Sequence, residues 1–269
     1  MPHVTSDGAR IRYDDTGSSS LPVLLLAHGM FMDRRMFDRQ IDELSRVARI
    51  ICWDARGHGD TTDQGKPFTY WQSAHDAIAV LDKLGIERAV IGGMSQGGFT
   101  ALRLALAAPE RVSGLVLIGT EAGRPTPGQV EQYSELFAAW LDNTMPLEPI
   151  ATSLAPSLIG GDADRDQRVW IDRWLSQDRT LIAQAAKCIV DRESVTDRIA
   201  EISTPTLVIR GANDMSISSA AVHQMATALG SSVVEIAGAG HAVNWTHPTP
   251  VNEAIRDFIE TLTARDELR

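Results

Sequence analysis

Short runs of continuous apolar residues recur along the chain, and segments with a helical spacing of apolar residues lie between them. The runs cover residues 23–27, 47–53, 89–91, 115–118, 206–209 and 233–236. Such runs are typical of strands that are buried on both faces, as in a parallel sheet. The helical pattern is clearest at residues 78–84, 99–108 and 220–229. This alternation predicts an α/β fold with a doubly wound sheet.

The start of the chain follows a different pattern. Asp7 and Gly8 lie between two extended-looking segments, and Ile11 and Tyr13 alternate with charged residues. An Asp-Gly pair between alternating segments is typical of a tight two-residue turn. We therefore expect a β-hairpin at the start of the sequence.

The alternation of strands and helices stops after Gly119. A turn-rich stretch at residues 123–128 opens about seventy residues that have helical periodicity and no convincing strand, up to about Glu201. The next strand-like run then begins. We expect a core formed by residues 1–121 and 202–269, with a helical insertion at residues 122–201.

Aromatic residues in this insertion follow a helical spacing. Tyr133, Phe137 and Trp140 are spaced i, i+4 and i+7, and Trp170 and Trp174 are spaced i, i+4. The favoured interpretation is that they are helix faces packed on the core. The alternative is an aromatic lid over an active site, which would use some of the same residues.

Composition narrows the class of protein. The 269 residues include 25 Lys and Arg against 35 Asp and Glu, which gives a formal net charge of −10. Because phosphate binding needs clustered basic residues, this balance argues against a nucleic-acid partner. The 43% hydrophobic content fits a globular protein with a substantial core.

Cysteine usage and the chain's apolar segments bear on its compartment. Cys52 and Cys188 are its two cysteines, too few for a disulfide framework or a cysteine-based zinc site. The first residues do not have the pattern of a signal peptide, and no segment reaches the roughly 18 apolar residues of a membrane span. We expect a soluble cytoplasmic protein, a monomer or homodimer, that acts on a small molecule without nucleic-acid or membrane partners.

A G-x-S-x-G motif follows the apolar run at residues 89–91. It reads Gly93-Met94-Ser95-Gln96-Gly97, and a helical pattern follows it. A serine in a sharp turn between strand and helix needs neighbours two positions away that lack a clashing Cβ. This context indicates a nucleophile, while the alternative is a glycine-rich connection that only packs the helix on the sheet.

A serine nucleophile needs a histidine base. Of the seven histidines, His241 is the candidate, because it follows the run at residues 233–236 through the flexible loop 237–240. His247, beside Pro248, and His223, inside a helical pattern, have settings that favour surface or structural roles.

The base in turn needs an acid. Asp214 lies in the loop after the run at residues 206–209, and open α/β sheets build their sites at the carboxyl ends of strands. The rival is Glu121, just beyond the run at residues 115–118. Asp54 also follows a strand, but it is interpreted as a carboxylate that organises the turn at residues 54–59.

Two backbone N–H groups should bind the oxyanion that forms during acyl transfer. One is expected from Gln96, at the N-terminus of the helix after the serine, where the helix dipole is favourable. The other is expected from Met30, in the loop at residues 28–31. His28 is interpreted as an architectural residue that hydrogen-bonds within that loop.

Metal and nucleotide sites are not supported by the motifs. The sequence has no H-E-x-x-H pattern and no paired Cys/His spacing, so no metal site is expected. Residues 92–98 lack the G-x-G-x-x-G register of a dinucleotide site, and they follow too late in the chain for a first-strand site.

Several motifs together resemble those of the α/β-hydrolase superfamily, in its serine-nucleophile branch. In the family's order they are His28-Gly29, Asp54-x-Arg56-Gly57-x-Gly59, Gly93-x-Ser95-x-Gly97-Gly98, Asp214 and Gly240-His241. The resemblance implies an α/β-hydrolase fold: a mostly parallel eight-stranded sheet with helices on both faces and a helical cap between strands six and seven. It also implies a Ser95–His241–Asp214 triad in the expected chain order, with no cofactor.

Within this superfamily, residues 204–214 and the chain's size are similar to 3-oxoadipate enol-lactonases and small esterases. The chain is also similar to cofactor-free haloperoxidases, which act as perhydrolases with the same triad. Trp245 resembles the tail of meta-cleavage carbon–carbon bond hydrolases, but residues 28–32 depart from their glycine-rich loop and Met94 replaces their usual Asn. The serine nucleophile argues against haloalkane dehalogenases and epoxide hydrolases.

We therefore predict a serine hydrolase, a carboxylesterase or lactonase, that cleaves a small or medium apolar ester or lactone. The non-enzyme alternative is a ligand receptor derived from this fold, which an intact triad disfavours. The expected apolar lining of the pocket, between sheet and cap, is Met30, Phe31, Met94, Trp140, Trp170, Trp174, Val243 and Trp245. Arg124 or Arg192 would suit a carboxylate on the substrate, although a surface position is the favoured interpretation of both.

Overall fold

Eight strands form one sheet in the computed structural model, which describes residues 1–17 and 20–266. The strands are β1 (His3–Ser6), β2 (Ala9–Asp15), β3 (Val23–Ala27), β4 (Arg49–Trp53), β5 (Ala89–Met94), β6 (Val112–Ile118), β7 (Thr206–Gly211) and β8 (Val233–Ile236). Their order across the sheet is β1-β2-β4-β3-β5-β6-β7-β8. β1 and β2 pair antiparallel, as do β2 and β4, and the remaining pairs are parallel. The predicted mostly parallel eight-stranded sheet is confirmed.

The first two strands form the predicted hairpin. Ser6 pairs with Ala9, so Asp7 and Gly8 make the whole turn. Both have positive φ angles, 38° and 73°, as a type I′ turn requires. Gly8 accommodates this angle without strain because it has no Cβ.

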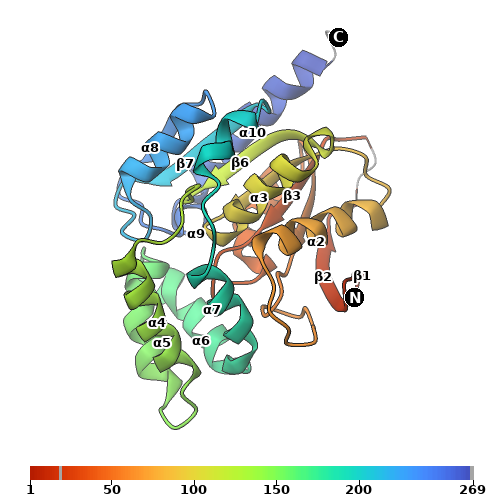
Figure 1. The fold of residues 1–269 in the computed structure, drawn as a ribbon. Coiled ribbons are helices and arrows are strands. Elements are labelled where there is room, and N and C mark those ends of the chain that lie inside the picture. The colour runs from red at the N-terminus through yellow and green to blue at the C-terminus, as the bar shows by residue number, and fades with distance from the viewer. Residues whose placement is uncertain (18–19, 267–269) are drawn as a thin grey trace.

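Helices cover both faces of the sheet (Figure 1). α2 (Tyr70–Lys83), α3 (Gln96–Ala107) and α8 (Ser219–Ala228) lie on one face, while α1 (Asp38–Leu44) and α10 (Pro248–Asp266) pack together on the other. α10 approaches β6 closely at Gly114, where an added Cβ would lie 2.6 Å from Leu262. The sequence pattern did not predict α1 or α10. No helix in the described ranges is both long and apolar enough to cross a bilayer.

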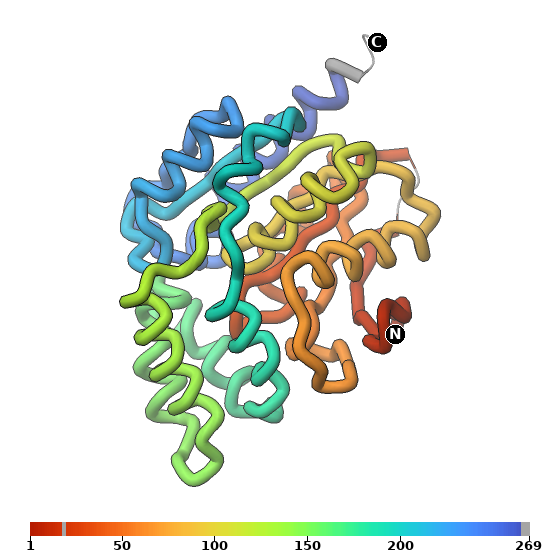
Figure 2. Tube along the Cα trace, viewed as in Figure 1, coloured from red at the N-terminus to blue at the C-terminus, as the bar shows by residue number. Residues whose placement is uncertain are grey.

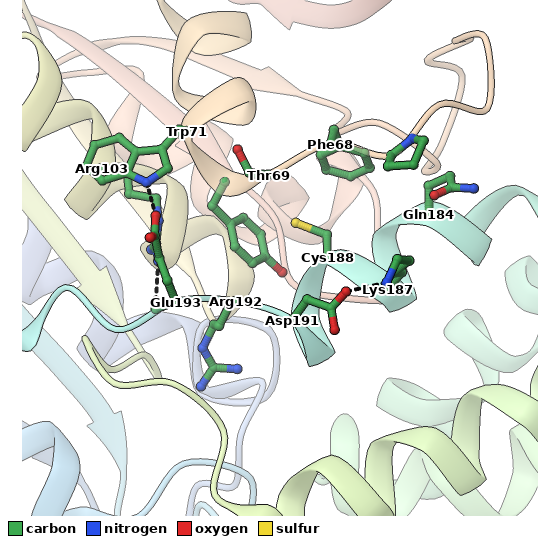
Figure 3. Close-up of a pocket in the computed structure, with 12 residues that line it drawn as sticks. Phe68, Thr69, Trp71, Arg103, Gln184, Lys187, Cys188, Asp191, Arg192 and Glu193 are labelled. Carbon is green, nitrogen blue, oxygen red and sulfur yellow. Dashed lines mark hydrogen bonds and ion pairs between the residues drawn. The ribbon is translucent and has the colours of Figure 1, made fainter.

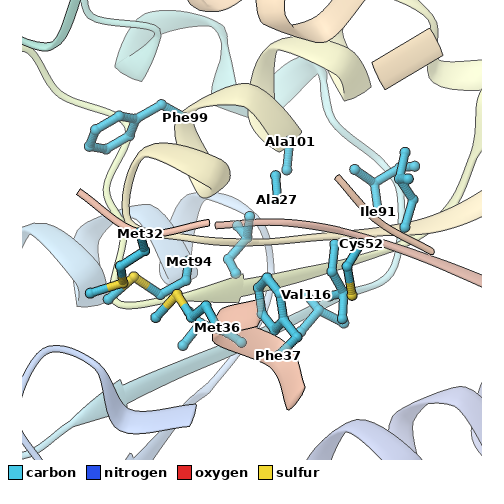
Figure 4. Close-up of a cluster of buried hydrophobic side chains, with 14 of the residues drawn as sticks. Ala27, Met32, Met36, Phe37, Cys52, Ile91, Met94, Phe99, Ala101 and Val116 are labelled. Atoms are coloured by element: carbon cyan, nitrogen blue, oxygen red, sulfur yellow. The ribbon is translucent and has the colours of Figure 1, made fainter. Parts of the chain in front are cut away.

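Apolar side chains fill the space on both sides of the strands. All six residues of β5 are buried, as the continuous apolar run predicted. Figure 4 shows Met36, Phe37 and Met94 gathered on one side of the strands, and all three are fully buried. The core therefore extends to Met94, the residue that immediately precedes Ser95.

Four α-helices lie between β6 and β7, where the helical insertion was predicted. They are α4 (Pro127–Leu141), α5 (Leu147–Leu158), α6 (Arg168–Ser176) and α7 (Ala183–Val190). They gather at one end of the molecule (Figure 2). A capping box at Thr126 and Gln129, with Pro127 in the first turn, begins α4.

The insertion is attached to the core near α9 (Val243–Thr246) by a buried polar contact. Asp166, in a π-helical turn at Ala163–Gln167, is fully buried. Its carboxylate accepts a hydrogen bond from Arg39 of α1 (2.6 Å), and its carbonyl oxygen accepts one from the Trp245 indole (3.0 Å). The Arg39 guanidinium also stacks 4.0 Å above the Trp245 ring. This contact holds the insertion close to the loop that carries His241.

Candidate active site

The loops after β3, β5, β7 and β8 meet at the carboxyl edge of the sheet, where open α/β sheets bind ligands. Ser95 follows β5 directly, Met30 follows β3, and His241 follows β8. These three residues line one cavity of about 290 Å³. Asp214, after β7, lies behind His241 and contacts its ring.

Ser95 is held in an unusual backbone conformation. Its φ and ψ angles are 52° and −115°, a region that non-glycine residues rarely adopt. Its N–H donates to the carbonyl oxygen of Ile118 (2.9 Å), and its own carbonyl oxygen accepts from the Thr120 hydroxyl (2.8 Å). Contacts with the end of β6 therefore fix the strained turn from both sides.

Close backbone approach explains the glycines on either side of Ser95. A Cβ on Gly97 would lie 1.9 Å from the carbonyl oxygen of Ala27, and a Cβ on Gly93 would lie 2.1 Å from the carbonyl carbon of Gly97. The expectation that these positions exclude a Cβ is confirmed. The turn consequently brings the start of α3 directly against the end of β3.

His241 and Asp214 form a buried pair. The distance from His241 Nδ1 to Asp214 Oδ2 is 2.9 Å, and the two side chains are 2% and 0% exposed. The other carboxylate oxygen accepts from the N–H groups of Ser216 (2.8 Å) and Ile217 (3.2 Å). Gly119 lies against the pair, since its added Cβ would be 3.4 Å from both His241 Nδ1 and Asp214 Oδ2.

The surroundings of Asp214 favour its ionised form. Burial raises the pKa of this carboxyl, but the charge and hydrogen bond of His241 and the two backbone N–H groups together bring the pKa below its ordinary value. Because a carboxylate only accepts, the His241 proton lies on Nδ1. The Nε2 lone pair of a neutral His241 is then free to accept a proton.

The loop after β3 is also held rigidly. Ala55 N–H donates to His28 Nε2 (3.0 Å), so the proton of His28 lies on Nδ1, which donates to the carbonyl oxygen of Gly29 (2.8 Å). In a trans peptide this oxygen and the Met30 N–H point in opposite directions. His28 therefore orients the Met30 amide, and its predicted hydrogen bond within the loop is confirmed.

The Gln96 side chain is bound to a residue that the sequence analysis did not single out. Its amide lies 3.4 Å from Nε2 of His58, and its oxygen accepts from the Tyr70 hydroxyl (3.4 Å). His58 Nδ1 donates to the carbonyl oxygen of Arg56 (3.0 Å), so Nε2 is an acceptor. The buried position of His58 was not visible in the sequence because it lies in a turn.

Neither of these buried histidines is suited to act as a base. Burial lowers the pKa of His28 to about 4 and that of His58 to about 3. The other two histidines considered lie away from the cavity: His223 is exposed on α8, and His247 bonds to the Thr246 hydroxyl (3.0 Å). Only His241, among the histidines of the described residues, lines the cavity with Ser95.

The rival acids have other partners. Glu121 forms a buried ion pair with Arg192, with 2.5 Å between Oε1 and Nη2. Burial raises the pKa of Glu121, and the Arg192 charge opposes that shift. Asp54 accepts from the Arg34 guanidinium (2.6 Å) and from Asp60 N–H (2.9 Å), so the interpretation of Asp54 as a turn-organising carboxylate is confirmed.

The two arginines considered for substrate binding differ in position. Arg124 is exposed, as expected. Arg192 is buried, which corrects the expectation of a surface position. Its guanidinium lies 4.1 Å above the Phe99 ring. The ion pair with Glu121 satisfies its charge, and the sequence cannot show that pairing because the two residues lie 71 positions apart.

Most of the cavity wall comes from residues that the sequence analysis did not select for the pocket. Besides Met30, Phe31, Ser95 and His241, the wall is formed by Phe99, Gln129, Gln132, Tyr133, Leu136, Phe137, Leu154, Ser157, Leu158, Ile189, Met215, Ser216 and Ile217. Among these described residues there is no Asp, Glu, Lys or Arg. The helical spacing of Tyr133 and Phe137 was the one signal that pointed to α4.

Six residues expected to line the pocket are not in this wall. Trp140 and Trp174 instead support Phe31 from behind: the Trp140 ring is 4.3 Å from the Phe31 ring, and the Trp174 indole donates to the Phe31 carbonyl oxygen (2.7 Å). Trp170 and Trp245 pack against each other, with ring centroids 5.5 Å apart.

The remaining two are Met94 and Val243, which are fully buried. Met94 packs below Gly29, where an added Cβ would lie 2.7 Å from its sulfur. Val243 begins α9, and its N–H donates to the carbonyl oxygen of His241 (2.9 Å). Both positions face the protein interior, so these residues support the site without entering its wall.

Metal-ligating side chains are not gathered in the described part of the chain. Across residues 1–17 and 20–266, no group of three or more His, Cys, Asp and Glu side chains is arranged to hold a metal ion.

Comparison with known proteins relates most of the chain to one family. The family model described as "alpha/beta hydrolase fold" matches residues 22–248. The chain is 28% identical to 3-oxoadipate enol-lactonase 2 of Acinetobacter baylyi, with 94% of each chain covered. It is also 28% identical to 2-hydroxy-6-oxononadienedioate/2-hydroxy-6-oxononatrienedioate hydrolase 2 of Pseudomonas putida, with 93% of this chain and 92% of that one covered.

A solved structure shows the same architecture. A thermophilic esterase from Thermogutta terrifontis superimposes with a TM-score of 0.87 at 28% identity, covering 97% of this chain and 98% of the esterase. These similar proteins include a lactonase, an esterase and a hydrolase named for a dienedioate, so they do not have one substrate class in common.

Proposed function

Because the family match spans most of its length, the chain belongs to the alpha/beta hydrolase fold family, and we propose that it is a serine hydrolase that cleaves a small or medium apolar carboxylic ester or lactone. The observation that supports this best is the shared cavity of Ser95 and His241, with His241 bonded through Nδ1 to a buried carboxylate. A nucleophile, a base and a group that orients the base are the parts needed for acyl transfer.

The proposed mechanism has two steps, and in each of them His241 first takes a proton and then gives it up. His241 Nε2 takes the Ser95 proton as the serine oxygen attacks the carbonyl carbon, and the imidazolium then protonates the leaving alkoxide. An acyl-enzyme remains on Ser95. His241 next takes a proton from water, the hydroxide attacks the acyl carbon, and the imidazolium returns the proton to the serine oxygen. Asp214 keeps the histidine in the required tautomer and stabilises its charge.

The Met30 and Gln96 N–H groups are proposed to bind the oxyanion in both steps. Two observations support this. The His28 hydrogen bond fixes the peptide that carries the Met30 N–H, and Gln96 is the first residue of α3, where backbone N–H groups have no partner inside the helix. The loop also lies close to the serine, since a Cβ on Gly29 would be 3.6 Å from the Ser95 Cβ.

The uncharged wall of the cavity supports a neutral substrate. A substrate with two carboxylates, such as the dienedioate named for one relative, would lose much of its hydration on entering and would need cations in return. Arg192 is a cation behind this wall, but Phe99 covers its guanidinium and Glu121 neutralises its charge. A neutral ester or lactone has no such requirement.

We also propose that the helical insertion, residues 122–201, acts as a cap over a core of residues 1–121 and 202–269. α4 and α5 support this role, because Tyr133, Phe137, Leu154 and Leu158 contribute the side of the cavity that belongs to the insertion. Substrate selection would then depend on the cap, while the proposed chemistry depends on the core.

The proposal is tested with a panel of neutral esters, lactones, 1,3-diketones and dicarboxylate analogues, measured on the wild type and on Ser95→Ala. We expect hydrolysis of neutral esters or lactones, and a loss of about 10⁶ in kcat for Ser95→Ala. Ser157→Ala is the matched control, since this serine lines the same cavity from α5. Turnover by Ser95→Ala within tenfold of the wild type would overturn the proposal.

A further inference from the structure

A second cavity lies on the other side of Phe99 from the active cavity. Its volume is about 320 Å³. Figure 3 shows it between the start of α2, with Phe68 just before the helix and Trp71 in its first turn, and α7, which carries Cys188. Pro67, Phe68, Tyr70 and Cys188 provide apolar surface. The charged residues of the lining are Arg103, Lys187, Asp191, Arg192 and Glu193, of which Lys187 and Asp191 pair with each other.

The two cavities share a thin partition. Phe99 lines the active cavity, and its ring lies 5.3 Å from the Tyr70 ring and 4.1 Å from the Arg192 guanidinium, both of which line the second cavity. α7 divides the cavities in the same way, because Ile189 lines the first and its neighbour Cys188 lines the second. Phe99 is therefore the layer of the partition that faces the substrate.

We propose that Phe99 is the specificity-determining residue that limits the length of the chain carried by the substrate, by closing the active cavity against the second one. The inference rests on the proposed function, since it assigns the end of the substrate pocket. Phe99 is 1% exposed and wedged between Tyr70 and Arg192, so a substrate cannot displace it by a simple rotation. Its removal extends the cavity towards Tyr70 and the Arg192 guanidinium, and beyond them towards Phe68 and Cys188 in the second cavity.

The test is a series of p-nitrophenyl esters of increasing acyl length, measured on the wild type, Phe99→Ala and Phe99→Leu. We expect the acyl length of greatest kcat/KM to increase in Phe99→Ala, and to increase less in Phe99→Leu. Each methylene newly admitted should raise kcat/KM about fourfold on the longer esters. Truncation of this buried ring costs stability, so Phe99→Leu, which keeps a side chain at the position, tests the same trend in a milder variant.

Phe137→Ala is the matched control. Phe137 is another buried phenylalanine of the same cavity, but its ring neighbours are Phe31 and Tyr133, which line that cavity themselves. Its truncation removes the same volume and opens no route to the second cavity. An equal gain in Phe137→Ala and Phe99→Ala, or unchanged length profiles in both folded Phe99 variants, would overturn the proposal.

Filling the second cavity provides an independent check. Cys188→Phe places a ring in that cavity, so in the Phe99→Ala background it should reverse the gain on long esters. A gain that persists in this double variant would mean that the chain does not enter the second cavity, which contradicts the proposal.

A binding measurement separates this inference from the proposed function. Neutral alkylamides of increasing length are added to Ser95→Ala proteins with and without Phe99→Ala, and the melting temperature is recorded. Longer amides should stabilise the Phe99→Ala protein more than its parent. If the wild type hydrolyses no ester or lactone but this length dependence is found, the proposed function fails and the role of Phe99 stands. If the length dependence is missing, the role of Phe99 fails.

Discussion

His28 and His58 lie ring against ring, with centroids 4.9 Å apart. Each is buried and neutral, and each holds one side of the proposed oxyanion site: His28 bonds to Gly29, and His58 contacts the side chain of Gln96. Two loops from different strands are thereby joined through two uncharged imidazoles. Protonation of either ring would place a charge in a buried site next to its neighbour.

We predict that acid destabilises the protein through this pair before most carboxylates titrate. The folded pKa values are about 4 for His28 and about 3 for His58, against an ordinary value of about 6.5. Below pH 6.5 the unfolded chain therefore binds more protons than the folded protein. The contribution of the two histidines to the free energy of unfolding is complete above pH 6.5 and is lost as the pH falls towards 4. Each histidine contributes up to about 1.4 kcal/mol per pH unit to the slope of the unfolding free energy against pH.

Urea unfolding between pH 7.5 and 5 measures this slope, with His58→Gln as the comparison. Glutamine keeps a polar side chain but does not titrate, so this variant should show about half of the histidine contribution. The exposed His223 offers a control, because His223→Gln should leave the slope unchanged. Equal slopes in the wild type and in His58→Gln would contradict the prediction.

How well a feature of this protein can be predicted from the sequence depends on how local that feature is. The continuous apolar run of β5 and the glycines around Ser95 are constraints within a short segment, and the structure has both as expected. Asp7 and Gly8 similarly determine the first turn alone. These features depend on backbone geometry and burial, which the pattern of residues reports directly.

Features that depend on distant packing were predicted less well. Trp140 and Trp174 have the helical spacing of buried residues, but spacing alone does not show whether a buried ring faces the cavity or supports Phe31 from behind. Arg192 resembles an exposed arginine in sequence, and only the fold brings Glu121 against it. The cavity wall is likewise assembled from α4, α5 and loops of the core, so no single segment contains its signal.

We predict that Gly97→Ala prevents normal folding or abolishes activity. The new Cβ would lie 1.9 Å from a backbone oxygen of β3, a clash that only movement of α3 or of the strand can relieve. Gly128→Ala, in the first turn of α4, is the control, because apart from its own helix nothing lies within 4 Å of its added Cβ. The melting temperature and the rate of ester hydrolysis should fall in Gly97→Ala and stay unchanged in Gly128→Ala. A Gly97→Ala protein with normal activity would refute this explanation of the turn.

We predict that Asp214→Asn lowers kcat by about 10⁴ while leaving the fold intact. The amide can present a donor to His241 Nδ1, which stabilises the tautomer with its proton on Nε2 and removes the base. Glu121→Gln is the comparison, since Glu121 is the other carboxylate considered as the acid. Steady-state kinetics should show the large loss in Asp214→Asn alone, and a larger loss in Glu121→Gln would reassign the acid.

We predict a strong coupling between Arg192 and Glu121. The pair is buried, with 2.5 Å between the charged groups, and Arg192→Met would leave the Glu121 carboxylate without its cation. Breaking a buried pair from one side costs about 3–5 kcal/mol, whereas replacing both partners by apolar residues is often nearly neutral. The double variant Arg192→Met/Glu121→Leu should therefore recover most of the stability lost in Arg192→Met.

The pH dependence of the stability of these variants gives a second test of the coupling between Arg192 and Glu121. Burial already raises the pKa of Glu121, and loss of the Arg192 charge raises it further. The folded state of Arg192→Met then binds a proton more readily than the unfolded state, so its deficit in unfolding free energy should shrink as the pH falls from 7 towards 5. Urea unfolding of the wild type, both single variants and the double variant measures both effects. Additive losses that do not change with pH would show that the ion pair contributes no coupling.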